Sequence, residues 1–164
     1  MKKRRLIVNA ALLAAIYVSL CAVLQPISFG TIQFRFSEML CLLSIDYLWA
    51  FWGVVLGCLL SNLFIGGLGI VDVVFGTLAT FIACLMAYLF RKIRYRNYPV
   101  LSAFVIALVN GVIIGIELGY ILDTINLIPL YMLQVFIGEA VVLAIGLPIY
   151  KRLKETVFST LENK

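Results

Sequence analysis

Histidine is absent from this 164-residue chain, and charged residues make up only 13% of it. The protein therefore lacks the side chain that most often serves as general base and as metal ligand. It also has no Gly-x-x-x-x-Gly-Lys-Ser/Thr phosphate loop, no nucleophile paired with a base, and no carboxylates at a metal-binding helical spacing. We predict no enzyme activity, no metal and no cofactor, and an intramembrane enzyme remains only a distant alternative.

Apolar residues are abundant: they form 64% of the chain, and the mean hydropathy is +1.12. These values lie far outside the range of soluble globular proteins and predict an all-α integral membrane protein. The apolar runs approach or exceed the ~20 residues that cross a bilayer as a helix. They cover residues 6–25, 38–66, 70–90, 99–122 and 126–150. With no polar linker or low-complexity segment between them, we predict one domain over residues 1–164.

Twelve of the thirteen basic residues form three clusters at the ends of these runs. The clusters are Lys2 to Arg5, Arg91 to Arg96, and Lys151, Arg152 and Lys154 with Lys164. Basic clusters mark the cytoplasmic side of membrane helices, so topology and anionic lipid headgroups explain the net charge of +5 without a nucleic-acid partner.

A single helix over residues 38–66 would place the first two basic clusters on opposite sides of the membrane. A break at Asp46-Tyr47 places all three basic clusters on the same side of the membrane. It predicts six helices with both termini cytoplasmic. The resulting pieces, 38–48 and 51–65, are short for a ~30 Å hydrocarbon core. They are either short helices inside the bundle or a re-entrant hairpin.

The four cysteines lie inside apolar runs, at spacings that fit neither a metal site nor a disulfide scaffold. We interpret Cys21, Cys41, Cys58 and Cys84 as small buried hydrophobes.

Polar residues within the runs share a depth near the outer ends of the predicted helices. Because membrane-embedded acids are costly and normally face a cavity, we predict a polar pocket open to the outside. Its candidate members in the helices are Glu38, Asn62, Asp72, Asn110, Glu117, Tyr120, Gln134 and Glu139. Two alternatives stay open: Asp72 is also placed to favour a helix N-terminus, and Asn110 to bridge two helices.

Arg35 is the one basic residue outside the clusters. In an extended segment over residues 31–38, Gln33, Arg35 and Ser37 would share one face, and Phe34 and Phe36 the other. Such a strip could close over a planar ligand. The alternative is an interfacial loop in which Arg35 pairs with Glu38.

Small residues let the backbones of membrane helices approach closely, so a row of them on the predicted first helix indicates a helix contact. Ala10 with Ala14, and Ala11 with Ala15, form a face that is either ordinary apolar filling or a docking surface for another membrane protein.

The six-helix layout, the long first outer loop and this alanine face resemble the substrate-binding S components of energy-coupling factor (ECF) transporters. Residues 32–38 (IQFRFSE) and 66–80 (GGLGIVDVVFGTLAT) are similar to two blocks typical of the queuosine-precursor transporter (QueT) family. The resemblance extends over the whole chain.

This resemblance implies a small-molecule binding subunit in a prokaryotic plasma membrane. Transport would require an ECF module: a membrane coupling subunit, contacted partly through the alanine face, and two ATPase subunits. The implied ligand is a 7-deazapurine such as queuine or a precursor base. The acids would accept its N–H donors, Gln33 or Arg35 would serve its carbonyl oxygen, and Phe34, Phe36 and Tyr120 would stack on its ring. Alternatives are an S component for another vitamin or purine and, more distantly, a structural helix bundle.

Overall fold

The computed structural model describes residues 2–29, 32–66 and 68–158. Thr31, Gly67 and Lys164, which enter the sequence predictions, lie outside these ranges. The described chain is helical and contains no β-strand. Its elements are α1 (Lys2–Val23), α2 (Gln25–Ser28), η1 (Phe36–Leu40), α3 (Cys41–Ser44), α4 (Leu48–Phe64), α5 (Ile70–Leu89), α6 (Val100–Ile121), η2 (Ile125–Leu127), α7 (Ile128–Leu153) and η3 (Lys154–Phe158).

Helix boundaries follow local backbone chemistry. Gly69 precedes α5 with φ of 73°, a left-handed conformation that glycine adopts without steric cost. Pro99 immediately precedes α6, and a proline lies in the first turn of α7, where its missing N–H leaves no helical hydrogen bond unmade. The long helices between these boundaries have large apolar side chains on their outer faces.

Within the described residues, four helices are long and apolar enough to cross a membrane: those around α1, α5, α6 and α7. The 17-residue α4 is shorter. The predicted second helix is a 3₁₀ segment, η1, followed by the four-residue α3. The prediction of six membrane helices is therefore not confirmed, whereas the chain does turn at Asp46-Tyr47, as predicted.

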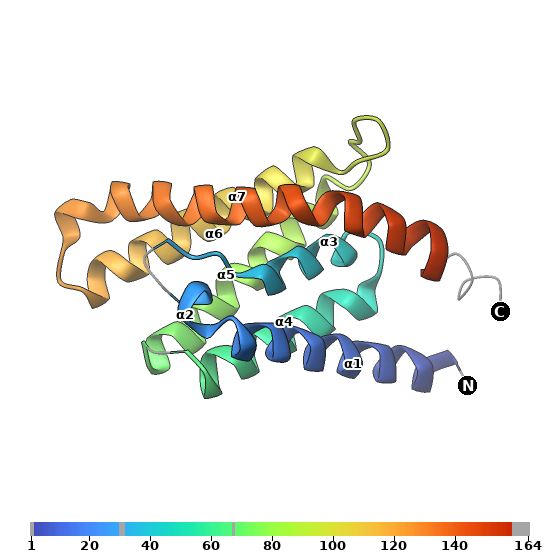
Figure 1. Ribbon diagram of the computed structural model, residues 1–164, viewed down its shortest axis with the longest axis horizontal. Helices are drawn as coiled ribbons and strands as arrows, with labels where there is room; N and C mark the ends of the chain where they lie inside the picture. Colours follow the sequence, from blue (N-terminus) through green and yellow to red (C-terminus); the bar gives the residue numbers. More distant parts are fainter. Residues whose placement is uncertain (1, 30–31, 67, 159–164) are drawn as a thin grey trace.

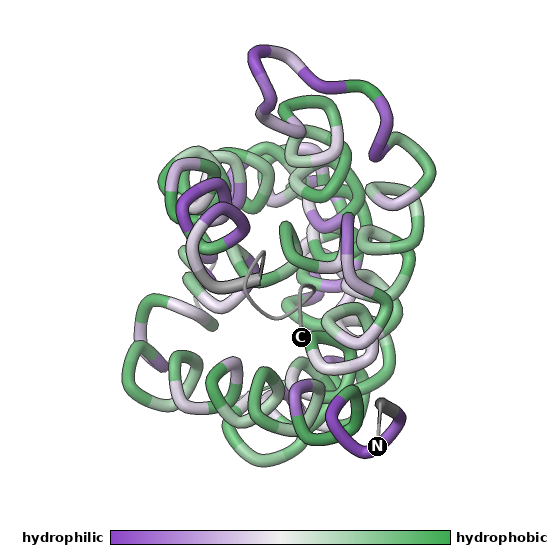
Figure 2. The backbone as a smooth tube through the Cα atoms, turned by 90° about the vertical axis from the view of Figure 1, so that its right-hand side faces the viewer, coloured by the Kyte–Doolittle hydropathy of each residue, from purple (hydrophilic) through white to green (hydrophobic). Residues whose placement is uncertain are grey.

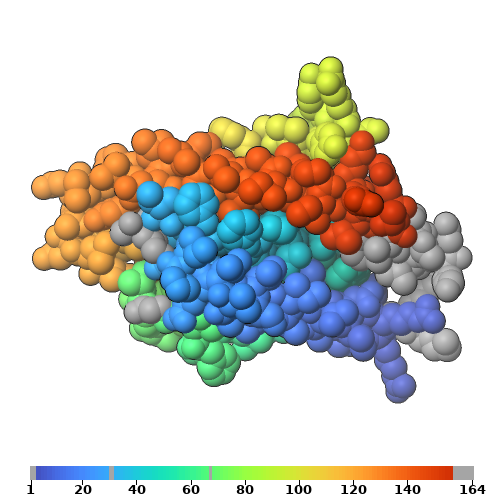
Figure 3. Space-filling model, viewed as in Figure 1, coloured from blue at the N-terminus to red at the C-terminus, as the bar shows by residue number. Residues whose placement is uncertain are grey.

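Figure 1 shows α1 beginning and α7 ending at the same end of the bundle. Neighbouring helices pack in the order α1, α4, α5, α6 and α7, and η1 contacts both α1 and α7. In Figure 3 the segment that contains η1 is visible on the surface between α1 and α7. The segment that contains η1 and α3 thus lies between the first and the last long helix.

The described residues of the three predicted basic clusters lie at one end of the molecule. Figure 2 views this end and shows hydrophilic backbone at the start of α1, in the loop after α5 and at the end of α7. This shared end agrees with a common membrane side for both termini; which side it faces stays a prediction.

Asp46 ties this end together. Its carboxylate accepts hydrogen bonds from Arg94 at 2.7 Å, from Lys154 at 2.7 Å and from the Tyr150 hydroxyl. Burial by itself raises the pKa of Asp46, but the hydrogen bonds from Lys154 and Tyr150 and the charge of Arg94 lower it below the ordinary value. One carboxylate therefore joins the α3–α4 turn, the α5–α6 loop and the end of α7.

Glycine allows α1 and α4 to pack closely. A Cβ on Gly53 would lie 2.7 Å from the carbonyl oxygen of Ala10, and one on Gly57 would lie 2.7 Å from Cβ of Tyr17. Ala14 is buried in this contact, so it is not available to another protein, as the predicted docking face required. Ala11 and Ala15 are exposed, and for them the prediction stays open.

Candidate binding site

Residues 32–35 run without helical structure into the bundle, and their side chains alternate between two faces. Gln33 and Arg35 are each 2% exposed, and Ser37, at the start of η1, is 1% exposed. Phe34 and Phe36 are only partly buried. The predicted polar face is confirmed, and it points into the protein. We call residues 32–38 the inner strip.

The inner strip rests against α7 because Gly138 has no side chain. A Cβ at this position would collide with the backbone carbonyl oxygen of Gln33. This contact fixes how deeply the strip enters the bundle.

Glu38 lies in the middle of the protein. One of its carboxylate oxygens accepts hydrogen bonds from the Tyr17 hydroxyl and from Thr80 at 3.1 Å. The other accepts from Cys41 at 2.8 Å and from the Asn110 amide at 3.5 Å. Thr80 and Asn110 are near the midpoints of α5 and α6, so the prediction of Glu38 at the outer end of a helix is wrong. The alternative role of Asn110, bridging two parts of the bundle, is what the structure contains.

Arg35 is a buried cation with few direct partners. One guanidinium nitrogen lies 3.9 Å from the Cys58 sulfur, and the group stands over the Phe29 ring at 4.8 Å from its centroid. Nε and the second terminal nitrogen have no hydrogen-bond acceptor. Among the described residues Arg35 forms no ion pair with Glu38, because that carboxylate is already held by four donors.

Buried acceptors without donors lie on four helices, α4, α5, α6 and α7. Asp72 and Glu117 each retain carboxylate oxygens that accept no hydrogen bond, as does Glu139. The charge of Arg35 acts on all three acids. The buried polar atoms without a partner that we group here are Arg35 Nε and Nη2, Asn62 Oδ1, Asp72 Oδ2, Glu117 Oε1 and Oε2, Gln134 Oε1, and Glu139 Oε2. We call this set the orphan cluster.

The orphan cluster lies in the half of the bundle away from the termini. Asn62 and Glu117 are near the ends of α4 and α6, Asp72 is in the first turn of α5, and Gln134 is in the first half of α7, whereas Glu139 is near the midpoint of α7. Most of these residues thus lie in the half in which they were predicted, with Glu139 nearer the middle. Burying polar atoms without partners is costly, so this set is our candidate for a ligand site.

Glycines make room for part of the cluster. A Cβ on Gly66 would lie 2.5 Å from Oδ2 of Asp72, and one on Gly76 would collide with the Asn62 amide. The same amide donates to the backbone carbonyl of Asp72 at 3.1 Å. Asn62 and Asp72 thus form one wall; Asp72 also remains in the first turn of α5, where a carboxylate favours the helix dipole.

Tyr120 does not join the site, since it is 65% exposed. It lies one turn after Ile116, which is also exposed, so both belong to the outer face of α6. Phe34 and Phe36 lie on the face of the inner strip opposite Arg35. Neither these two rings nor Tyr120 is placed to stack on a ligand in the orphan cluster.

Sequence reasoning missed Tyr17, Cys58 and Thr80. All four cysteines are buried, as predicted, but the Cys58 sulfur is more than a hydrophobe: it receives hydrogen bonds from Asn62 at 3.4 Å and from Thr80 at 3.2 Å. A usable signal existed for Thr80, because Asp72, Gly76 and Thr80 recur every four residues on one face of α5.

Chemically, the site offers one guanidinium, two amide side chains and three carboxylates away from bulk water. Its unused groups are mostly acceptors, so it favours a small polar molecule with several N–H donors and at least one acceptor for Arg35. Within residues 2–29, 32–66 and 68–158, no group of three or more potential ligands is placed to hold a metal ion.

A model of the QueT transporter family matches residues 7–155, nearly the whole chain. No curated protein and no solved structure matches this chain.

Proposed function

Because the chain belongs to the QueT transporter family, we propose that it is the substrate-binding S component of an ECF-type importer for a queuosine precursor. Family membership and its long apolar helices indicate a multi-pass membrane protein of a transporter family, which is not an enzyme family. The proposal adds the substrate, the importer class and the orientation, with both termini cytoplasmic in a prokaryotic plasma membrane.

The observation that carries the proposal is the orphan cluster. A ligand that donates to the three acids and accepts from Arg35 would supply the missing hydrogen bonds, each worth more in a buried site than in bulk water. Empty, the protein bears the cost of these unpaired groups; bound, it recovers that free energy as affinity.

A 7-deazaguanine matches this set of groups. Its guanine-like edge has adjacent N–H donors that one carboxylate can accept in a bidentate manner, and its carbonyl oxygen can accept from Arg35 or Gln33. A protonated aminomethyl substituent would occupy a second carboxylate. Glu117 and Glu139 are our first candidates for these roles, with Asp72 and Asn62 on the adjoining wall.

Calorimetric titration of the purified protein tests the substrate. We expect queuine or 7-aminomethyl-7-deazaguanine to bind tightly, and riboflavin, thiamine and biotin not to bind. Tight binding of one of the vitamins instead would favour the second candidate, an S component for another nutrient. Replacing Glu117 and Glu139 together by alanine should abolish deazapurine binding, whereas Asp123→Asn, which removes an exposed charge between α6 and α7, should preserve it.

ATP hydrolysis must come from partner subunits in this proposal, since the chain has no phosphate loop. A membrane coupling subunit would use the exposed Ala11 and Ala15 of α1 rather than the buried Ala14. Co-purification with a nucleotide-binding subunit tests this assembly; isolation without one under several mild detergents would instead support a structural helix bundle.

A further inference from the structure

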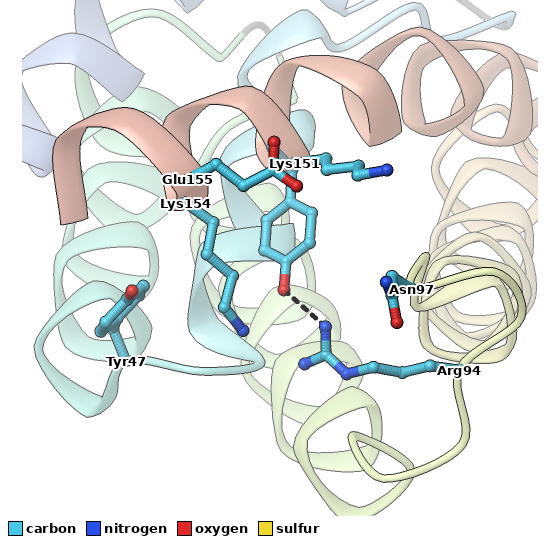
Figure 4. Close-up of a pocket in the computed structure, with 7 residues that line it drawn as sticks. Tyr47, Arg94, Asn97, Lys151, Lys154 and Glu155 are labelled. Atoms are coloured by element: carbon cyan, nitrogen blue, oxygen red, sulfur yellow. Dashed lines mark hydrogen bonds between the residues drawn. The ribbon is translucent and has the colours of Figure 1, made fainter. Parts of the chain in front are cut away.

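The end of the bundle that carries both termini contains a polar cavity, far from the orphan cluster along the helices. It has a volume of about 490 Å³ and lies between the end of α7, the α5–α6 loop and the start of α4 (Figure 4). Its lining residues are Tyr47, Arg94, Asn97, Tyr150, Lys151, Lys154 and Glu155.

The lining keeps an excess of positive charge. Three cations, Arg94, Lys151 and Lys154, face two carboxylates, those of Glu155 and of the neighbouring Asp46. Arg94 uses three of its five N–H donors, on Asp46, on Tyr150 and on the carbonyl oxygen of Arg91. The two lysines hold most of the donors that remain for an incoming anion.

Both lysines retain donors. Lys154 uses one of its three N–H groups on Asp46 and keeps the others. Lys151 stands over the Tyr98 ring at 4.9 Å and forms no ion pair within the described part of the chain. Figure 4 shows Lys154 directed toward Arg94 and Lys151 directed toward the loop that carries Asn97.

Tyr47 lines both this cavity and an apolar groove of about 480 Å³. Apart from Asp46 and Tyr47, its walls are apolar side chains from the starts of α1 and α4: Leu6, Ile7, Ala10, Leu48, Trp49 and Trp52. Tyr47 and Trp49 pack against each other with ring centroids 5.7 Å apart. Tyrosine and tryptophan of this kind are typical of the membrane–water interface.

We propose that the cavity and the groove together bind one anionic phospholipid of the leaflet at this end. The phosphate lies beside Lys151 and Lys154, and an acyl chain occupies the groove. Basic cavities between membrane helices attract anionic headgroups. The apolar walls of the groove would bury the acyl chain away from water. The inference is independent of which substrate the orphan cluster takes.

Native mass spectrometry of the delipidated full-length protein tests the site. We expect phosphatidylglycerol to bind with an affinity at least about fivefold higher than phosphatidylcholine, and a large excess of inorganic phosphate to leave it in place. Lys151→Gln should lower the affinity for phosphatidylglycerol about fivefold. Arg152→Gln, which removes the same charge from an exposed neighbour that does not line the cavity, should have little effect.

The groove has its own pair of variants. Ile7, 69% exposed, lines the groove, whereas Leu12, 60% exposed, lies elsewhere on α1. Ile7→Ser should weaken the binding of both lipids, whereas Leu12→Ser should not change the binding of either. Equal affinity for the two lipids, equal effects of the two charge variants, displacement by phosphate alone, or no effect of Ile7→Ser would each overturn the proposal.

Discussion

Glu38 and Glu117 are both buried glutamates, but their surroundings are opposite. Glu38 accepts from four donors on three helices and on its own segment, whereas both oxygens of Glu117 lack a donor. At the residue scale, a satisfied buried acid stabilises the fold and an orphaned one lowers its stability. The same substitution should therefore have opposite consequences at the two positions.

Glu38→Gln should destabilise the protein by about 1–3 kcal/mol, because the new amide N–H group would face donors whose hydrogen bonds the carboxylate oxygen accepted. Thermal unfolding in detergent measures the loss as a lower Tm. An unchanged Tm would show that the four hydrogen bonds do not contribute to stability.

Glu117→Gln should raise the Tm of the ligand-free protein while lowering affinity for a deazapurine by about tenfold or more, since it removes a buried charge that a ligand would neutralise. Parallel unfolding and calorimetry on the same preparation give both values. A variant that loses both stability and binding would indicate a structural acid instead.

At the element scale, the inner strip positions Arg35 through its contact with α7. Gly138→Ala should push the strip away from α7, because the new methyl group meets backbone that cannot rotate aside. We expect ligand affinity to fall at least about tenfold with α-helix content unchanged by circular dichroism. Val141→Ala, an exposed change on the same helix, is the control and should leave affinity as it was.

Asp46 gives a prediction in pH. Its pKa in the folded protein lies below the ordinary value of 3.8, so folding favours the ionised form. This contribution is complete above the unfolded value and is lost as the pH falls through the lowered one. Asp46→Asn should lower the Tm at pH 7 by a few degrees, and the gap to the wild type should close toward pH 3. Lys92→Gln, an exposed change in the α5–α6 loop, should leave this pH dependence as in the wild type.

The lengths of the apolar runs predicted the long helices, because membrane helices must be continuous and apolar. The sidedness of the basic clusters predicted the turn at Asp46-Tyr47. The alternation of polar and aromatic residues predicted that Gln33, Arg35 and Ser37 share a face. Sequence patterns could not predict that Glu38 is central, since its four donors come from segments up to 72 residues away. Nor could depth alone predict that Tyr120 faces outward, because depth fixes position along a helix and not rotation about it.

At the scale of the whole molecule, the basic clusters predict which side each end faces. The four native cysteines are buried, so single introduced cysteines can report accessibility with little background. A membrane-impermeant maleimide added to intact cells should label Asp123→Cys, between α6 and α7, and not Lys92→Cys, between α5 and α6. If only Lys92→Cys were labelled, the orientation would be the opposite of the one predicted.

The inner strip also constrains biogenesis. Residues 32–35 are polar and not helical, so in lipid their backbone N–H and C=O groups would face hydrocarbon unless another segment covers them. Part of this cover is α7, which begins 90 residues after Glu38 at Ile128 and is synthesised after α1, α4, α5 and α6. The inner strip therefore reaches its final place only after α7 has been made, and in a nascent chain arrested before α7, Arg35 and Glu38 would lack this cover.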